Sequence, residues 1–132
     1  MQACLPVNAG GLGVRLASHI APSAFLASAS ATKELQSLLL NGAFMDTSNF
    51  IDTALSAWST LSSAPPPSEP ASFKQLEWDK AVVKFQRDLL LASQVDETSK
   101  ARLLAVSAPH SGDWLHALPI SNCGLRLDYK AI

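Results

Sequence analysis

The stretch SFKQLEWDKAVVKFQRDLLLASQV, residues 72–95, decides the fold of this chain. Two apolar stripes run along it at helical spacing, one with Trp78, Val82, Phe85 and Leu89 and the other with Leu76, Val83 and Leu90. Ser72 and Gln75 have the spacing of a capping box. The pattern predicts a helix from Ser72 to about Val95 that is packed between neighbours on both sides, with Trp78 and Phe85 buried.

Helices are also predicted before this stretch. One begins near Val14 and ends at Pro22, which starts a second helix that stops at Asn41-Gly42. A third has three candidate N-caps, Asp46, Thr47 and Ser48. Its apolar face is predicted to consist of Phe50, Ala54, Ala57 and Leu61, with Ile51 and Trp58 beside it.

After residue 95, Asp96 is the predicted N-cap of a further helix that ends before Pro109. Its inward-facing residues are predicted to be Leu103, Leu104 and Val106. Residues 114–118 suit one more helical turn. Alternation of apolar and charged residues over 125–128 is typical of a short strand.

The sequence therefore predicts a single all-α domain over residues 1–132, an irregular bundle of about four to five helices. It comprises an irregular, glycine-rich lead-in (1–13), N-terminal helices (14–63), a Pro-rich link (64–71), and C-terminal helices with an extended tail (72–132). The link APPPSEP, residues 64–70, cannot be helical.

Charge is scarce in this chain. The net charge is −1 and charged residues make up 16% of the sequence, against about 25% in a typical protein. The balance argues against strong autonomous nucleic-acid binding, and low charge leaves faces that need a partner. No window reaches the roughly 20 apolar residues of a membrane span.

Secretion and a stapling disulfide are both disfavoured. The stretch around residues 15–31 imitates a signal peptide, but His19, Pro22 and several serines interrupt it, so an intracellular location is expected. Cys4 and Cys123 are expected to be reduced, and neither has a second cysteine at zinc-finger spacing.

Four groups of residues invite a functional interpretation. Lys80, Lys84 and Arg87 share one helical face and are the candidate contacts for nucleic acid. Glu77 and Asp88 lie on the same face at pairing distance, which favours a solvated, salt-bridged surface and weak binding at best. The tryptophans Trp58, Trp78 and Trp114 could stack on bases, but two of them lie on apolar stripes and suit a core.

The other two groups lack a standard pattern. His110, Asp113, His116 and Cys123 fit no known zinc spacing, so turn and surface roles are favoured and no metal or cofactor is expected. The GGLG at residues 10–13 lacks the Lys-Ser/Thr of a phosphate-binding loop, which favours a simple turn. No catalytic residues are predicted.

Four segments of the sequence carry a resemblance. They are LPVNAGGLGVR (5–15), APSAFLAS (21–28), RLLAVSAPHSGDWL (102–115) and SAPHSGDWLHALPISNCGLRLD (107–128). In this order they resemble the region that follows the polymerase domain in reverse transcriptases of eukaryotic non-LTR retrotransposons. The resemblance covers nearly the whole chain and is strongest at its two ends.

The resemblance implies a truncated copy of that region, whose role in an intact parent is to pack against the polymerase and help hold the RNA–DNA substrate. The polymerase signature of the family, an aromatic residue closely followed by Asp-Asp, does not occur in this sequence. The chain is therefore expected to have no enzyme activity alone. The alternative is a self-standing helical module whose apolar grooves bind a protein partner.

Overall fold

The computed structural model describes residues 2–40 and 48–113, and over these ranges the chain is all-α, as predicted. The four helices are α1 (Ala17–Leu39), α2 (Ser48–Leu61), α3 (Gln75–Ser93) and α4 (Glu97–Val106). Single 3-10 turns occur at η1 (Gln2–Cys4), η2 (Val7–Ala9) and η3 (Ala71–Phe73). Residues 114–118 and 125–128, with their predicted helical turn and strand, lie outside the described ranges.

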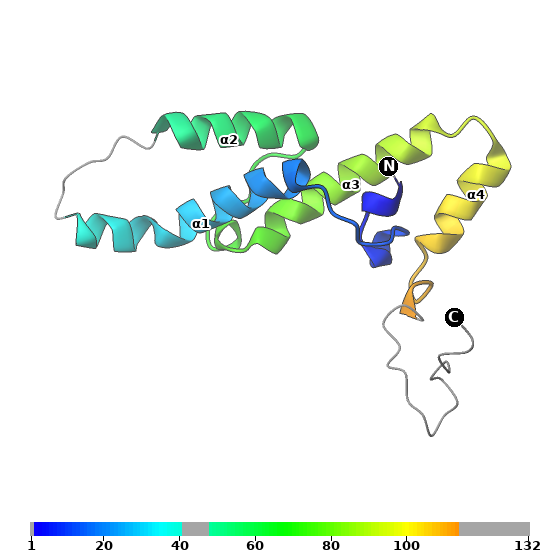
Figure 1. The fold of residues 1–132 in the computed structure, drawn as a ribbon, viewed down its shortest axis with the longest axis horizontal. Helices are drawn as coiled ribbons and strands as arrows, with labels where there is room; N and C mark the ends of the chain where they lie inside the picture. The colour runs from blue at the N-terminus through cyan, green and yellow to red at the C-terminus, as the bar shows by residue number, and fades with distance from the viewer. Residues whose placement is uncertain (1, 41–47, 114–132) are drawn as a thin grey trace, which may run out of the picture.

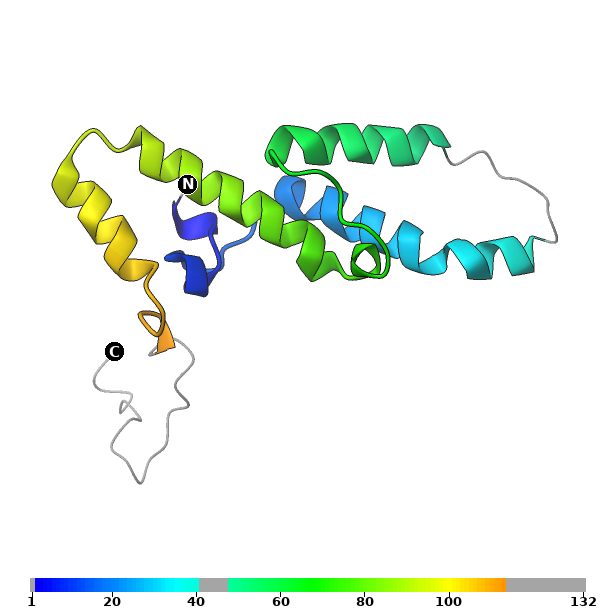
Figure 2. The same cartoon turned by 180° about the vertical axis from the view of Figure 1, so that it is seen from behind.

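The helices are arranged in two groups that share α3 (Figure 1). At one end, α1 and α2 run in opposite directions and pack with the first half of α3. The second half of α3 extends past them, and α4 turns back from its end. The lead-in of residues 2–16 lies in the angle between α3 and α4, as Figures 1 and 2 both show.

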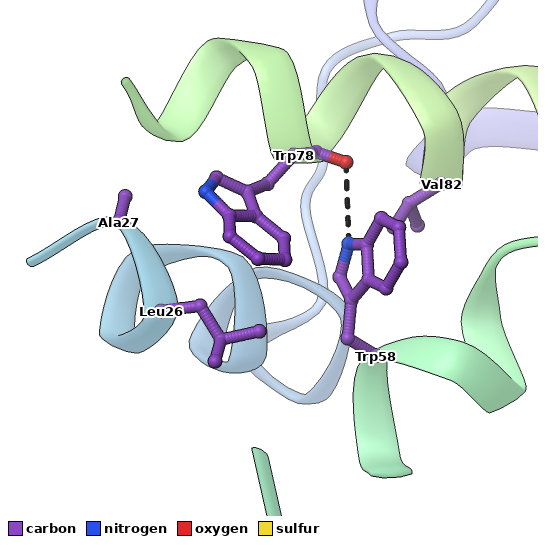
Figure 3. Packing of buried hydrophobic residues seen from close by; sticks show 5 residues of the cluster. All are labelled: Leu26, Ala27, Trp58, Trp78 and Val82. Atoms are coloured by element: carbon purple, nitrogen blue, oxygen red, sulfur yellow. Dashed lines mark hydrogen bonds between the residues drawn. The ribbon is translucent and has the colours of Figure 1, made fainter. Parts of the chain in front are cut away.

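A pair of tryptophans forms the centre of the first group (Figure 3). Trp58 from α2 is fully buried, and its ring meets that of Trp78 from α3 edge to face, with centroids 5.1 Å apart and planes at 85°. Leu26, Ala27 and Val82 complete the buried cluster. Both indole N–H groups are satisfied: Trp58 Nε1 donates to the Trp78 carbonyl (3.3 Å) and Trp78 Nε1 to the Ser72 carbonyl (2.8 Å).

Fewer residues of α3 are buried than the sequence predicted. Trp78 and Val82 are buried, but Phe85 is only half-buried and Leu89 is 59% exposed, so the predicted burial of Phe85 is wrong. On the second stripe, Leu76 is 63% exposed. Length explains the exposure of Leu89 and the partial exposure of Phe85, because α3 is longer than the part covered by α1 and α2 and this stripe leaves the core halfway along. Leu76, in the first turn, belongs to the other stripe and lies outside the buried cluster.

The buried face of α2 also differs from the prediction. Phe50 is 70% exposed and Ala57 is exposed, whereas Trp58 is fully buried. The residues that pack against the core are Ile51, Ala54, Leu55 and Leu61 together with Trp58. The buried face of α2 is therefore rotated relative to the predicted one, because the large Trp58 ring takes the centre of the contact with the core.

Of the three proposed N-caps, Asp46 and Thr47 lie outside the described residues, and Ser48 is the first residue of α2.

Pro22 neither ends nor starts a helix. Helix α1 begins at Ala17, later than the predicted Val14, and runs through Pro22 to Leu39 without a break. Proline at this position removes only the hydrogen bond to the carbonyl of Ser18, which is exposed and can bond to water. The single long helix can therefore tolerate it.

The predicted capping box at Ser72 and Gln75 is not formed. Ser72 belongs to η3, and α3 begins at Gln75 with Lys74 in the capping position and no side-chain cap bond. The Ser72 carbonyl accepts the Trp78 indole proton instead. Residues 64–70 contain no helix, as their prolines predict.

Asp96 caps α4 as predicted, since its Oδ2 accepts the Ser99 backbone N–H at 3.0 Å. Of the three residues predicted to face inward, Leu103 is buried, but Leu104 and Val106 are 47% and 41% exposed. Helix α4 has neighbours on one side only, and this explains the difference. No helix in the described ranges combines the length and apolar character needed to cross a membrane.

Candidate functional site

The lead-in and the turn after α4 meet to form the site that joins the two ends of the described chain. Ser107 Oγ lies 3.1 Å from the Ala9 carbonyl and 2.7 Å from the Leu103 carbonyl, so its one proton is shared between a partner in the lead-in and one in its own helix. We call this contact, with its flanking glycines, the terminal junction. It links residues 98 positions apart in sequence.

Three glycines make the terminal junction possible. Gly10 has φ 83°, and a Cβ there would come within 2.6 Å of Ser107 Oγ. A Cβ on Gly11 would overlap the Leu5 carbonyl, and one on Gly112 would overlap a methyl group of Val7. Backbone approaches this close are open only to residues without a side chain.

A cavity of about 420 Å³ that is open to solvent lies at the terminal junction. Its lining residues are Gln2, Ala3, Val7, Gly10, Gly11, Leu12, Val106, Ser111 and Gly112. The two polar side chains among them are already engaged, since Gln2 Nε2 donates to the Gly10 carbonyl and Ser111 Oγ to the Val106 carbonyl. The cavity therefore offers an apolar wall without a charged or catalytic group.

A second contact fixes the lead-in to α3. Arg15 Nη2 lies 3.1 Å from Asp79 Oδ2, and the Asp79 side chain is only 8% exposed. Gln75 Nε2 donates to the same oxygen at 3.4 Å. A buried carboxylate requires such partners because its desolvation is costly. Sequence reasoning missed this pair, although an aspartate adjoining the buried Trp78 was a signal that a cation would be needed there.

The candidate nucleic-acid stripe does not form a uniform cationic surface. Lys80 Nζ lies 2.7 Å from Glu77 Oε1, which is the pairing that the sequence predicted. Lys84 is exposed, and among the ion pairs of the described residues there is none between Lys84 and Asp88, contrary to the prediction. Arg87 is half-buried, and its Nε is enclosed without a hydrogen-bond partner. Only Lys84 presents an exposed, unengaged cation, and this limits attraction to phosphates.

Trp58 and Trp78 are buried and cannot stack on bases, so the predicted core role is confirmed for both. Trp114 lies outside the described residues. The GGLG segment is a turn, as predicted, with positive φ at Gly10 and Gly13. Hydrogen bonds hold it to the preceding residues of the lead-in, such as the one that the Gly13 N–H donates to the Leu5 carbonyl at 2.9 Å.

Of the four residues considered as a metal-binding group, only His110 and Asp113 lie within the described ranges. His110, with φ 68°, places Nδ1 2.9 Å from Asp113 Oδ2, and both side chains are largely exposed. His116 and Cys123 lie outside the described ranges. Within those ranges no three histidine, cysteine or acidic side chains gather where a metal ion could be held. Cys4 is half-buried and forms no disulfide with a described residue.

The site that the fold builds is therefore structural: a glycine-lined junction with an apolar cavity, fixed to α3 by one buried ion pair. Comparison with known proteins adds no assignment, since no family model, curated protein or solved structure matches the chain.

Proposed function

We propose that this chain is a non-catalytic helical region of the kind that follows the polymerase domain in non-LTR retrotransposon reverse transcriptases, with an accessory role in packing against the polymerase and holding its RNA–DNA substrate. The observation that carries the proposal is the terminal junction. The resemblance is strongest at the two ends of the chain, and Ala9 in segment 5–15 contacts Ser107, the first residue of segment 107–128. Two segments that lie far apart in the sequence, and that both resemble the family, thus take part in one contact.

The resembling residues also have definite structural roles. Gly10 and Gly11 permit the close approach of the lead-in, and Arg15 holds Asp79 on α3. A segment with these roles supports the interpretation that the resemblance reflects a shared fold.

Exposed apolar residues around the lead-in suit a region that packs against a larger body. Leu12, Val14 and Leu16 alternate along an extended segment and are 63%, 60% and 39% exposed. Leu104 on α4 is 47% exposed. Exposed apolar residues are typical of interaction sites where they form a contiguous patch.

The test is reconstitution in trans. A polymerase domain from a non-LTR element, with its own post-polymerase region removed, is mixed with this chain and assayed for complex formation and for the length of primer-extension products on an RNA template. We expect a complex and longer products. A polymerase that neither binds the chain nor changes its product length would refute the proposal.

A matched pair of serine variants sharpens this test. Ser107→Ala removes the contact with Ala9, whereas Ser93→Ala removes a hydroxyl that bonds only within its own helix, to the Leu90 carbonyl. We expect the first variant to weaken the complex and the second to leave it unchanged. Equal effects would show that the terminal junction has no part in the accessory role.

The second candidate function is a self-standing helical module that binds a protein partner. The observation that favours it is the spread of exposed apolar residues beyond the lead-in, such as Leu76 (63%) and Leu89 (59%) on α3. If the chain acts as such a module in place of a polymerase accessory, the reconstitution assay will show no binding to the polymerase domain.

A further inference from the structure

The Pro-rich link between α2 and α3 lies outside both the buried cluster and the terminal junction. Three prolines follow one another in it, and residues 65–68 belong to no helix or turn. On the side of the molecule that Figure 2 shows, the link crosses α1 on its way from α2 to η3. Pro65 and Pro66 are exposed, and Pro67 is half-buried.

Proline restricts the backbone of this segment at every step. The ring holds φ of each proline at about −65°, and the residue before a proline is pushed toward an extended or polyproline II conformation. Ala64, Pro65 and Pro66 each precede a proline, so consecutive residues carry these restrictions. Together they favour a stiff polyproline II helix, which has about three residues per turn and no internal hydrogen bonds.

The exposed side of such a helix presents two kinds of contact. Successive residues point in different directions, so the exposed rings of Pro65 and Pro66 form two neighbouring ridges, while the half-buried Pro67 lies toward the protein. Prolines have no backbone N–H, so the segment offers hydrogen-bond acceptors alone. No hydrogen bond among the described residues uses the carbonyls of these three prolines.

Both ends of the segment are fixed to the body of the protein. The Ala64 N–H donates to Oγ of the buried Ser62 at 3.3 Å. The Ser72 N–H donates to the Ser68 carbonyl at 3.1 Å, and the Ser72 carbonyl accepts the indole proton of the buried Trp78. A ligand segment that is already held in its bound shape loses less entropy when it binds.

We propose that residues 64–68 are a recognition segment for a protein domain whose groove is lined by aromatic side chains and takes a polyproline II ligand. Aromatic rings of the groove pack on Pro65 and Pro66, and their tryptophan or tyrosine donors bond to the free carbonyls. Glu69, exposed directly after the segment, favours a groove with a basic rim. The segment is separate from the terminal junction, so this role does not depend on the proposed function.

Calorimetric titration of the full chain with three purified groove domains, an SH3, a WW and an EVH1 domain, tests the proposal. We expect a micromolar dissociation constant for at least one of them, because a segment this short makes a small interface. Pro65→Ala combined with Pro66→Ala should raise that constant about tenfold or more, since both ridges are lost. The control is Pro109→Ala, at an exposed proline in the turn after α4, and it should leave the constant unaltered.

A charge variant and a fold check complete the test. Glu69→Lys should also raise the dissociation constant, and an unchanged value would overturn the assignment of a basic rim. Circular dichroism shows whether each variant keeps its helices, and the single change Pro66→Ala replaces the double one if that variant does not. Absence of binding to all three domains, or equal effects of the proline changes in the segment and of Pro109→Ala, would overturn the proposal and leave the link as a spacer.

Discussion

Replacing Trp58 by alanine removes the largest of the fully buried side chains among the described residues. Trp58 is 0% exposed and joins α2 to α3 through the edge-to-face contact with Trp78 and through its indole N–H. Leu26 of α1 packs in the same cluster, so the ring contacts all three helices of the core. No neighbouring side chain can fill the space without moving a helix.

The cost follows from these contacts. Truncation of a buried aromatic residue to alanine typically costs about 3–5 kcal/mol. The edge-to-face pair accounts for about 0.5–1.5 kcal/mol of that, and loss of the Nε1 hydrogen bond for about 1 kcal/mol. The cluster holds only five buried residues, so the total stability should lie in the lower part of the usual range of about 5–15 kcal/mol. Trp58→Ala is therefore expected to remove half of it or more.

Urea unfolding followed by far-ultraviolet circular dichroism measures this cost without relying on tryptophan fluorescence. Lys84→Ala, on the exposed side of α3, is the control and should cost under about 0.5 kcal/mol. Phe85→Ala should fall between the two, at about 2 kcal/mol, because Phe85 is half-buried.

A double-mutant cycle with Trp78→Ala tests the ring contact itself. The coupling between Trp58 and Trp78 should be about 0.5–1.5 kcal/mol beyond additivity. If Trp58→Ala and Lys84→Ala unfold at the same urea concentration, the three-helix core described above is wrong.

Three further predictions concern the lead-in, α4 and activity. Arg15→Ala leaves the Asp79 carboxylate buried without its cation and should lower the free energy of unfolding by about 1–3 kcal/mol, a value discounted because Arg15 is partly exposed. The control Lys80→Ala breaks a surface pair and should lower it by under about 0.5 kcal/mol in the same urea assay. Hydrogen bonds from the backbone N–H groups of Ser99 and Thr98 lower the pKa of Asp96 below its ordinary 3.8, so the stability that this cap gives α4 is present above pH 3.8 and is lost as the pH falls through the lowered value. Asp96→Asn should keep the cap and remove this pH dependence of helicity, and an unchanged pH profile would contradict the assignment. The purified chain should show no template-dependent synthesis in primer extension with Mg²⁺. It should also bind an RNA–DNA hybrid only weakly at physiological salt, and submicromolar affinity would show that the stripe around Lys84 is more cationic than the Lys80–Glu77 pair implies.

Local signals in the sequence were sufficient for α2, α3 and α4, but not for α1, which runs through Pro22 as one helix where two were predicted. The Asp96 cap, the non-helical prolines of 64–70 and the Glu77–Lys80 pair each depend on residues a few positions apart, and the structure confirms them. The central helix was predicted for the same reason, since periodicity is a property of one segment. Its start was placed three residues early, since Ser72 belongs to the preceding 3-10 turn η3 and α3 begins at Gln75 without a side-chain cap bond.

Orientation could not be predicted in the same way. Whether Phe50 or Trp58 faces inward depends on where α1 and α3 lie, and α2 carries apolar residues on both candidate faces. Likewise, the burial of Phe85 depended on how far the neighbouring helices reach along α3. A sequence pattern states that a face is apolar, but the length and direction of its partners decide how much of that face is covered.

The terminal junction and the Arg15–Asp79 pair lie furthest beyond sequence reasoning, and they also explain how the two helix groups hold together. The tryptophan core fixes only the first half of α3, so α4 at the other end depends on the lead-in for its position. The lead-in is attached at two points, to Ser107 through Ala9 in its middle and to Asp79 through Arg15 near its end. Loss of either attachment should therefore loosen α4 while leaving the Trp58–Trp78 contact intact. Hydrogen exchange can separate the two groups, because Arg15→Ala and Ser107→Ala should raise exchange in α4 and leave α2 protected. Equal loss of protection in α2 and α4 would show that the chain is one cooperative unit and that the lead-in does more than attach α4.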